Sequence, residues 1–362
     1  MEHADFLGQK PVGRHVRTDP MLEITGIERR FGAAAAAVRG VSLTVWPGEV
    51  TCLLGPSGCG KSTTLRLIAG IERPDAGEIR IAGQVMADAR TDLPPERRPV
   101  GMVFQDLALF PHMTVAANVG FGLPRSKAAQ DMVTALLDRV GLAHHAAKYP
   151  HQLSGGEQQR IALIRALATR PRVMLLDEPF SSLDQRLRVE MRELALDLLR
   201  EEGAAVVLVT HDPDEAMMMA DRIAIMRDGR ILQEGAPLDI YHRPVDLAVA
   251  GFLSDLNVFS GRVAQGRVAT PIGELPAPGL GEGTSVNVAL RPEHLTPRRC
   301  NRAEAHAHVL RVQNLGRETV VELRLPGHGQ HLRCVLAGRS DLSPGEHVRI
   351  DFDPAGAMLF RR

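Results

Sequence analysis

The sequence lacks several features that would place it in other classes of protein. No run of about 18 apolar residues occurs, so no segment is predicted to span a membrane. Residues 1–20 lack the apolar core of a signal peptide, and their Gly, Pro, His and Arg content is typical of a flexible extension. Lys and Arg together number 43, the same as Asp and Glu, so no global positive charge points to nucleic acid as a partner.

Cysteine is also scarce. The four cysteines (Cys52, Cys59, Cys300 and Cys334) are far apart and form no C-x-x-C pair, which favours a reducing compartment over a disulfide framework. With 44% apolar and 24% charged residues, the composition is typical of a globular protein. We therefore expect a cytoplasmic protein, and 362 residues are enough for two domains of ordinary size.

A glycine-rich stretch, GPSGCGKS at residues 55–62, is the centre of the sequence. It fits G-x-x-x-x-G-K-[ST], in which successive backbone N–H groups surround a phosphate. An apolar run at residues 50–54 predicts a buried strand before it, and residues 63–69 predict a helix after it. Phosphate oxygens would then meet the positive end of the helix dipole. Lys61 is expected to contact the β- and γ-phosphates, and the Ser62 hydroxyl to ligate Mg²⁺. An accidental glycine-rich turn is the alternative.

A second motif, LSGGE at residues 153–157, begins a predicted helix. Ser154 as the N-cap, with Glu157 three residues later, is a capping box. A well-capped helix would explain that pair, but Gly155 and Gly156 weaken the first turn by about 1 kcal/mol each relative to alanine. A bare helix N-terminus is instead what a phosphate can approach.

Two acids follow an apolar run at residues 173–176. Four consecutive apolar residues predict a central parallel strand, and ligands bind at the carboxyl edge of such sheets. Asp177 is predicted to support Mg²⁺, and Glu178 to orient or deprotonate a water molecule. Acids at a strand end are also often only solvated. A further apolar strand at residues 204–210 leads to His211, which is either a surface histidine or part of the same sheet edge.

Other segments complete the expected fold. Alternation at residues 21–46 predicts strands with one solvated face, and residues 107–170 have the composition of an inserted helical subdomain. The prolines and charges of residues 93–99 predict a surface loop. From about residue 250, short β runs alternate with Gly/Pro turns, which predicts a small barrel or sandwich. The histidines there, His328 among them, lack the Cys or acid pattern of a metal site.

In this order the motifs resemble those of the ATP-binding-cassette (ABC) ATPase family, specifically the nucleotide-binding subunits of bacterial importers. The resemblance covers roughly residues 22–245. It rests on GPSGCGKS, Gln105, LSGGE, VMLLDEP (173–179), SSLD (181–184) and His211.

The resemblance implies an α/β fold in two domains. Residues 21–245 would form a P-loop NTPase cassette, with the helical subdomain at about 107–170. Residues 250–362, which include ALRPEH at 289–294, look like the small all-β, OB-like regulatory (TOBE) domain of many such subunits.

The resemblance also assigns roles around the reacting phosphate. Phe31, which from the residue alone is either a core aromatic or one that stacks on a base, takes the place of the aromatic that stacks on adenine. Gln105 would contact Mg²⁺ and the attacking water and relay to the membrane subunit. Asp177 would support Mg²⁺, Glu178 would act on the water, and His211 would brace the γ-phosphate.

Further residues would bind ATP or the second copy of the chain. In this family the LSGGE residues Ser154, Gly155 and Gly156, grouped here with Glu157, contact ATP bound to the other copy of a homodimer, and Asp184 lies at the dimer contact. The phosphate-binding residues would be Gly55, Pro56, Ser57, Gly58, Cys59, Gly60, Lys61, Ser62 and Thr63. The implied cofactors are ATP and Mg²⁺. The implied partners are integral membrane permease subunits and, indirectly, a periplasmic solute-binding protein, with the chain peripheral on the cytoplasmic face of the inner membrane.

The solute is less well specified. Residues 93–123 and 291–294 look most like importers of ferric iron, and polyamine (spermidine or putrescine) importers share much of the pattern. Sulfate, thiamine, phosphonate and sugar systems are further options. A soluble ABC ATPase acting on ribosomes or DNA is disfavoured, because the chain has no second cassette and no long coiled coil. A binding module without turnover is disfavoured by Glu178 and His211.

Overall fold

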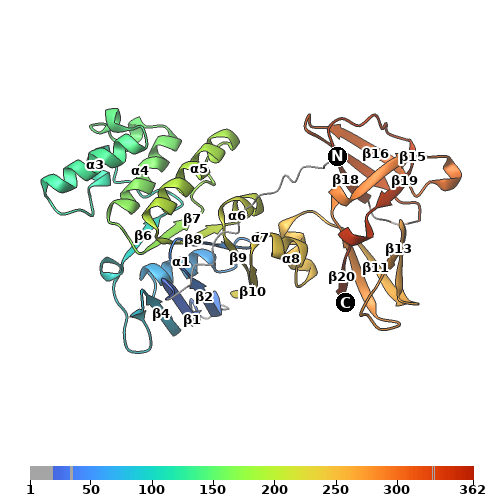
Figure 1. Ribbon diagram of the computed structural model, residues 1–362, viewed down its shortest axis with the longest axis horizontal. Coiled ribbons are helices and arrows are strands. Elements are labelled where there is room, and N and C mark those ends of the chain that lie inside the picture. Colours follow the sequence, from blue (N-terminus) through green and yellow to red (C-terminus); the bar gives the residue numbers. More distant parts are fainter. Residues whose placement is uncertain (1–18, 33–35, 328, 330) are drawn as a thin grey trace, which may run out of the picture. The chain divides into compact units, whose positions relative to one another are not determined.

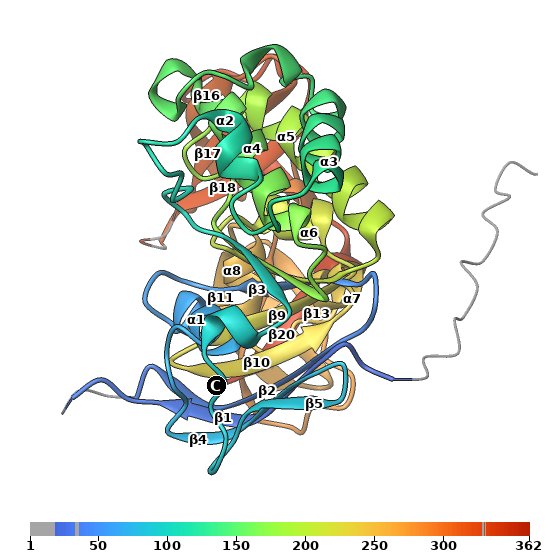
Figure 2. The ribbon, with the colours of Figure 1, turned by 90° about the vertical axis from the view of Figure 1, so that its left-hand side faces the viewer.

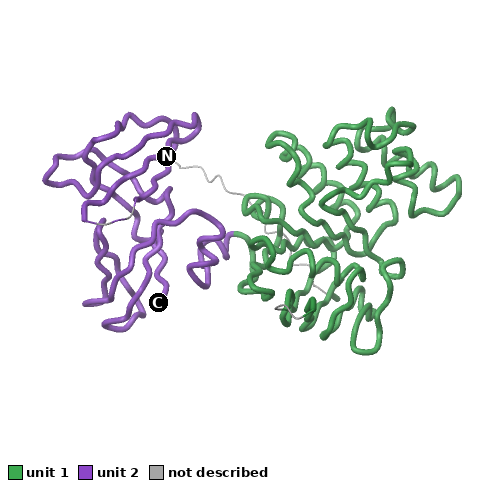
Figure 3. Tube along the Cα trace, turned by 180° about the vertical axis from the view of Figure 1, so that it is seen from behind, with its two compact units in different colours: residues 1–237 green, residues 238–362 purple. Residues whose placement is uncertain are grey.

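The computed structural model describes residues 19–32, 36–327, 329 and 331–362. Residues 1–18 of the predicted extension, and His328, lie outside the described residues. Figure 1 shows the elements, and Figure 3 shows that the chain divides into two compact units after residue 237.

The first unit contains two sheets. Its strands are β1 (Leu22–Arg29), β2 (Val38–Val45), β3 (Val50–Leu54), β4 (Ala76–Ile81), β5 (Gln84–Ala87), β6 (Val100–Val103), β7 (Val173–Asp177), β8 (Ala205–Thr210), β9 (Arg222–Arg227) and β10 (Arg230–Gly235). A four-stranded antiparallel sheet has the order β2-β1-β4-β5, and a six-stranded sheet has the order β10-β9-β3-β8-β7-β6. In the larger sheet all strands are parallel except the edge strand β10.

The burial of these strands follows their sequence patterns. Every residue of β3, β7 and β8 is buried, as the uninterrupted apolar runs predict for central parallel strands. The strands β1 and β2 instead contain buried and exposed residues in turn, which confirms the expectation of one solvated face.

In the described part of the first unit, six helices connect the strands. They are α1 (Lys61–Ala69), α2 (Val115–Val119), α3 (Lys127–Arg139), α4 (Gly155–Ala168), α5 (Gln185–Glu202) and α6 (Pro213–Met219). Within the unit, α2 to α5 gather at one end, and the four-stranded sheet lies at the other (Figures 1 and 2). Among the residues that the structure covers, no helix is long and apolar enough to cross a bilayer.

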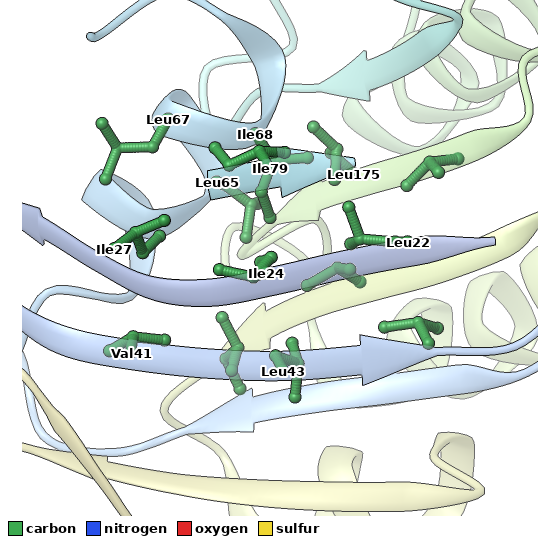
Figure 4. Close-up of a cluster of buried hydrophobic side chains, with 14 of the residues drawn as sticks. Leu22, Ile24, Ile27, Val41, Leu43, Leu65, Leu67, Ile68, Ile79 and Leu175 are labelled. Carbon is green, nitrogen blue, oxygen red and sulfur yellow. The ribbon is translucent and has the colours of Figure 1, made fainter. Parts of the chain in front are cut away.

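The helix α1 packs in the main core of the first unit, together with residues of both sheets. Figure 4 shows Leu65 and Ile68 of α1 beside Ile24 and Ile79 of the smaller sheet. The helix ends at Gly70, which adopts a left-handed conformation with φ of 80°.

A buried arginine holds the end of α1. Arg98 is only 4% exposed, and its Nη1 donates hydrogen bonds to the carbonyl oxygens of Leu67 (2.7 Å) and Ile68 (2.9 Å). Its Nη2 pairs with Asp92 at 2.9 Å. The prediction of a surface loop over residues 93–99 is therefore wrong for Arg98, because the carbonyls at the helix C-terminus attract a cation.

Over its described residues, the second unit is all-β apart from two short helices and 3₁₀ turns. Its elements are α7 (Pro237–His242, which begins at the boundary), α8 (Leu247–Leu253), β11 (Asn257–Ala264), β12 (Arg267–Thr270), β13 (Gly273–Pro276), β14 (Ser285–Leu290), β15 (Leu295–Arg299), β16 (Ala307–Asn314), β17 (Glu318–Arg324), β18 (His331–Ala337), β19 (His347–Phe352) and β20 (Met358–Arg361). The strands form two antiparallel sheets, β13-β12-β11-β14-β20 and β15-β19-β16-β17-β18, which share one core. This arrangement confirms the predicted small all-β domain.

Candidate functional site

The phosphate-binding motif forms a tight loop between β3 and α1, as predicted. No side chain caps the N-terminus of α1, where Gly60 is the N-cap with φ of 107°. A Cβ atom at Gly60 would lie 2.2 Å from the carbonyl oxygen of Ala37, and one at Gly55 would lie 2.1 Å from that of Met226. Both glycines are thus needed for the backbone to pack this closely. An uncapped helix N-terminus of this kind fits a phosphate.

Lys61 brings a positive charge into the loop. Its side chain is buried, and Nζ donates hydrogen bonds to the carbonyl oxygens of Gly55 (2.7 Å) and Pro56 (3.0 Å). Neutral carbonyls satisfy the donors of an ammonium group but leave its charge uncompensated. A phosphate group would supply the missing negative charge, so Lys61 fits the predicted role.

The two residues predicted to bind Mg²⁺ meet across the sheet. Ser62 Oγ donates a 2.8 Å hydrogen bond to Asp177 Oδ1 at the carboxyl end of β7. Burial raises the pKa of Asp177, although the hydrogen bond from Ser62 and the charge of Arg66 oppose this change. A hydroxyl and a carboxylate oxygen are ligands that Mg²⁺ prefers, and the cation would compensate the buried carboxylate. The pair therefore fits a magnesium site.

Glu178 and His211 are also brought together. His211 Nδ1 lies 3.1 Å from Glu178 Oε2, with the imidazole 52% exposed. Glu178 has φ of 45°, in the left-handed region that few residues other than glycine adopt. Its backbone N–H donates to the carbonyl oxygen of Val209 in the neighbouring β8 at 3.0 Å. A cavity of 270 Å³ is lined by Glu178, Ser181, Arg188, Thr210, His211, Asp212 and Glu215.

Gln105 and Phe31 lie on the surface. Gln105 is exposed and follows β6, the strand beside β7, so it belongs to the same carboxyl edge as Asp177. Phe31 is 44% exposed, and the guanidinium carbon of Arg29 lies 4.8 Å from its ring centre. The alternative that Phe31 is a core residue is therefore wrong, and its stacking on adenine stays a prediction.

The LSGGE segment forms the predicted capping box at the start of α4. Glu157 Oε2 accepts a 2.7 Å hydrogen bond from the Ser154 N–H, and Ser154 Oγ accepts one of 3.4 Å from the Glu157 N–H. The hydrogen bonds from Ser154 lower the pKa of Glu157. Glu157 Oε1 also lies 3.1 Å from His145 Nε2.

The two glycines of this segment differ in their surroundings. A Cβ atom at Gly155 would meet nothing within 4 Å, whereas one at Gly156 would lie 2.6 Å from Leu187 of α5. A side chain would therefore clash at Gly156 but not at Gly155. Gly156 therefore has a packing role within the chain, and the contact of Ser154, Gly155 and Gly156 with ATP stays a prediction.

Asp184 caps the neighbouring helix α5, where its side chain accepts a 3.0 Å hydrogen bond from the N–H of Leu187. It is exposed, like Ser154 and Gly155. These residues belong to the starts of α4 and α5, whereas the loop, Asp177 and His211 lie along the carboxyl edge of the sheet.

Sequence reasoning missed two arginines beside this site. Arg188 and Arg192 of α5 both contact Asp212, the residue after His211. They lie four residues apart and continue the stripe that carries Ala195 and Leu199, which are buried. A charged residue on an otherwise apolar stripe is the signal that would have revealed a buried ion pair.

The fold and the ordered site define the ATP-binding subunit of an ABC transporter, and the chain belongs to the ABC transporter family. The family profile described as "ABC transporter" matches residues 38–181, and the one described as "TOBE domain" matches residues 288–360. These findings confirm the predicted family, the α/β fold class and the ATPase class.

The chain is similar over most of its length to proteins that are named as ATP-binding proteins of ferric-iron import. It is 45% identical to "Fe(3+) ions import ATP-binding protein FbpC 2" of Rhodococcus jostii over 334 residues, which are 91% of this chain and 96% of that protein. The protein of the same name, without a number, from Serratia marcescens is 40% identical over 333 residues, again 91% and 96%. The one from one strain of Pseudomonas fluorescens is 47% identical over 276 residues, 76% and 78%.

Solved structures also match the cassette. A dimeric post-hydrolysis state of the ATP-binding cassette MJ0796 bound to ADP and Pi has a TM-score of 0.53 and 31% identity, and the match covers 60% of this chain and 99% of that one. The protein cbiO1 from Clostridium perfringens, part of the ABC transporter complex cbiONQ, has a TM-score of 0.57 and 29% identity, covering 62% and 92%.

Proposed function

We propose that this chain hydrolyses ATP to energise the import of ferric iron, as a homodimer bound to permease subunits on the cytoplasmic face of the inner membrane. The choice of ferric iron as the solute rests on the similarity to ferric-iron import proteins, which extends through both units at 40% to 45% identity. A periplasmic solute-binding protein would be an indirect partner of the dimer, connected to it through the permease.

The site supports a direct hydrolytic mechanism. The N–H groups of the loop and Lys61 would bind the ATP phosphates, and Ser62, Asp177 and Gln105 would hold Mg²⁺. The cation supplies charge neutralisation at the phosphate oxygens. Glu178 would accept a proton from the water whose oxygen attacks the γ-phosphorus, while the bond from that phosphorus to the β–γ bridging oxygen breaks. His211, held beside Glu178, would brace the γ-phosphate.

The dimer would complete the site from a second copy. We infer that Ser154, Gly155 and Gly156 of one copy contact ATP held by the loop of the other, and that Asp184 lies at the contact. The open surface at Gly155 supports this arrangement, because a phosphate can reach the helix start there. If ATP bridges two copies, it binds the closed dimer better than the open one, and hydrolysis lets the dimer reopen. We retain 21–245 and 250–362 as the proposed limits of the ATPase and regulatory domains.

Reconstitution with the permease tests this proposal. The chain would be coexpressed with a permease and a solute-binding protein of a ferric-iron importer, and uptake of radioactive ferric iron and of spermidine would be compared in proteoliposomes. We expect copurification with the permease and ATP-dependent uptake of ferric iron. Uptake of spermidine alone would support the polyamine alternative. Copurification with ribosomes or RNA, without the permease, would overturn the transport function.

A further inference from the structure

We propose that two arginines of α5, Arg188 and Arg192, act as positioning residues for His211. They would do so by fixing Asp212, the next residue in the chain. The proposal rests on the proposed function, which assigns His211 to the γ-phosphate. It goes beyond that function by naming the groups that place the imidazole and by linking them to the predicted dimer contact.

Both carboxylate oxygens of Asp212 are engaged. Arg192 Nη2 donates to Asp212 Oδ2 at 2.8 Å, and Arg188 Nη1 lies 3.7 Å from the same oxygen. Asp212 Oδ1 accepts hydrogen bonds from the N–H groups of Asp214 (2.9 Å) and Glu215 (3.3 Å), where it caps α6. Burial alone raises the pKa of Asp212, but the hydrogen bonds from Arg192 and from these N–H groups bring it below its ordinary value.

The residue before His211 is held by the same network. Thr210 Oγ1 donates to Glu215 Oε2 at 3.0 Å and accepts a hydrogen bond from the Asp212 N–H, also at 3.0 Å. Arg192 Nη2 lies 3.3 Å from that Glu215 oxygen. Because Thr210 and Asp212 are both fixed, the backbone of His211 is held on both sides. This backbone position keeps the imidazole Nδ1 of His211 3.1 Å from Oε2 of Glu178.

The network also reaches the segment that precedes α5. Arg188 Nη2 donates to the carbonyl oxygen of Leu183 at 2.9 Å, and Leu183 adjoins Asp184. A second copy that contacts Asp184 would therefore press on a backbone joined to Asp212 by one side chain. The arginines would thus make the position of His211 depend on the closure of the dimer.

The burial of the network indicates that it contributes more to the position of His211 than to the stability of the fold. Arg192 is 5% exposed and Glu215 3% exposed, so both charges are largely removed from water. Replacing a buried ion pair by apolar residues of similar volume often leaves stability unchanged or raises it. Apolar residues of similar volume can therefore replace Arg192 and Glu215 without loss of stability. Such a replacement distinguishes an effect on stability from an effect on the position of His211.

The test uses the full-length chain and two variants of the pair. Arg192→Met alone leaves the Glu215 carboxylate buried without its arginine, so we expect a lower melting temperature and lower turnover. The double variant Arg192→Met/Glu215→Leu should regain the melting temperature, while kcat for ATP hydrolysis stays about 10-fold or more below wild type and KM for ATP changes less than about 2-fold. Arg200→Met, at an exposed position in the last turn of α5, is the control and should leave kcat unchanged. Recovery of wild-type kcat by the double variant would overturn the proposal.

A double-mutant cycle then asks whether the arginine acts through His211. In single-turnover reactions with excess enzyme, adding Arg192→Met/Glu215→Leu to His211→Ala should change the residual rate less than about 2-fold, because the positioned group is already gone. Independent, multiplicative losses would overturn the positioning role and leave the proposed function standing. Wild-type turnover by His211→Ala alone would instead overturn the role of His211 in the proposed function, and the positioning role with it.

Discussion

Ser62 Oγ lies 2.8 Å from Asp177 Oδ1, so a hydrogen bond joins the first turn of α1 to the end of β7 across 115 residues of sequence. This contact brings together the two groups predicted to hold Mg²⁺. It also leaves the Asp177 carboxylate buried, with a hydroxyl group as its hydrogen-bond partner. In the absence of nucleotide, that carboxylate is a cost to the folded state.

We predict that Asp177→Asn stabilises the nucleotide-free protein and abolishes hydrolysis. Burial raises the folded-state pKa of Asp177 above the ordinary value of about 3.9, so its favourable contribution is complete below that pH and is lost as the pH rises through the folded-state pKa. The melting temperature of the variant should exceed that of wild type by about 2 °C at pH 8, and by less at a pH below that ordinary value.

Differential scanning fluorimetry at the two pH values measures this effect. Glu193→Gln, at an exposed position of α5, is the control and should leave the melting temperature unchanged at both. A melting temperature below wild type at pH 8, or the same gain at both pH values, would show that the buried charge is not a cost.

Glu178→Gln should retain ATP binding and accumulate the ATP-bound dimer. Glutamine has nearly the same shape as glutamate but cannot take a proton from water, so kcat should fall about 100-fold or more. The fold should persist, because neither side chain changes the left-handed backbone at this position. Gel filtration with ATP and a phosphate-release assay measure the two effects. Normal phosphate release would remove Glu178 from the proposed mechanism.

The two glycines at the start of α4 should respond differently to alanine. Gly155→Ala meets no neighbouring atom, so the free energy of unfolding should stay the same or rise by up to about 1 kcal/mol, while ATP-dependent dimerisation weakens. Gly156→Ala forces Leu187 to move and should lower the free energy of unfolding by about 1 kcal/mol. Urea titration and light scattering with ATP compare the variants. Unimpaired dimerisation of Gly155→Ala would count against the proposed role of this helix start.

Arg98→Ala should lower the free energy of unfolding by about 3 kcal/mol, because carbonyl groups at the end of α1 lose a charged, buried donor. The adjacent Arg97→Ala provides the matched control: Arg97 is exposed, and its loss should change stability by less than about 0.5 kcal/mol. Urea denaturation of the full-length chain measures both. Equal effects of the two substitutions would show that Arg98 does not hold the helix.

The sequence was sufficient where the physical cause is local. Residues 50–69 predict a strand, a glycine-rich loop and a helix because neighbouring residues determine all three, and Ser154 and Glu157 predict a cap for the same reason. The positions of Asp177 and His211 on one edge also followed, since parallel strands end at the same edge of a sheet.

The remaining features depend on contacts between distant segments. Arg98 looks like a loop residue until the carbonyls of Leu67 and Ile68 are placed beside it. The LSGGE motif likewise does not reveal that Gly156 packs against Leu187. Arg192 likewise gains its significance from Asp212, twenty residues later on another element. The composition of a local segment does not predict which distant residues it will contact.

Arg98 gives α1 a fixed end. The helix begins at a backbone suited to an anion and finishes on a guanidinium buried against its last carbonyls, so opposite charges would complement its dipole at both ends once phosphate is bound. These contacts would oppose a shift of the helix along its axis. The free energy of ATP binding would then move the surrounding segments and a second copy of the chain, with α1 as the stationary part.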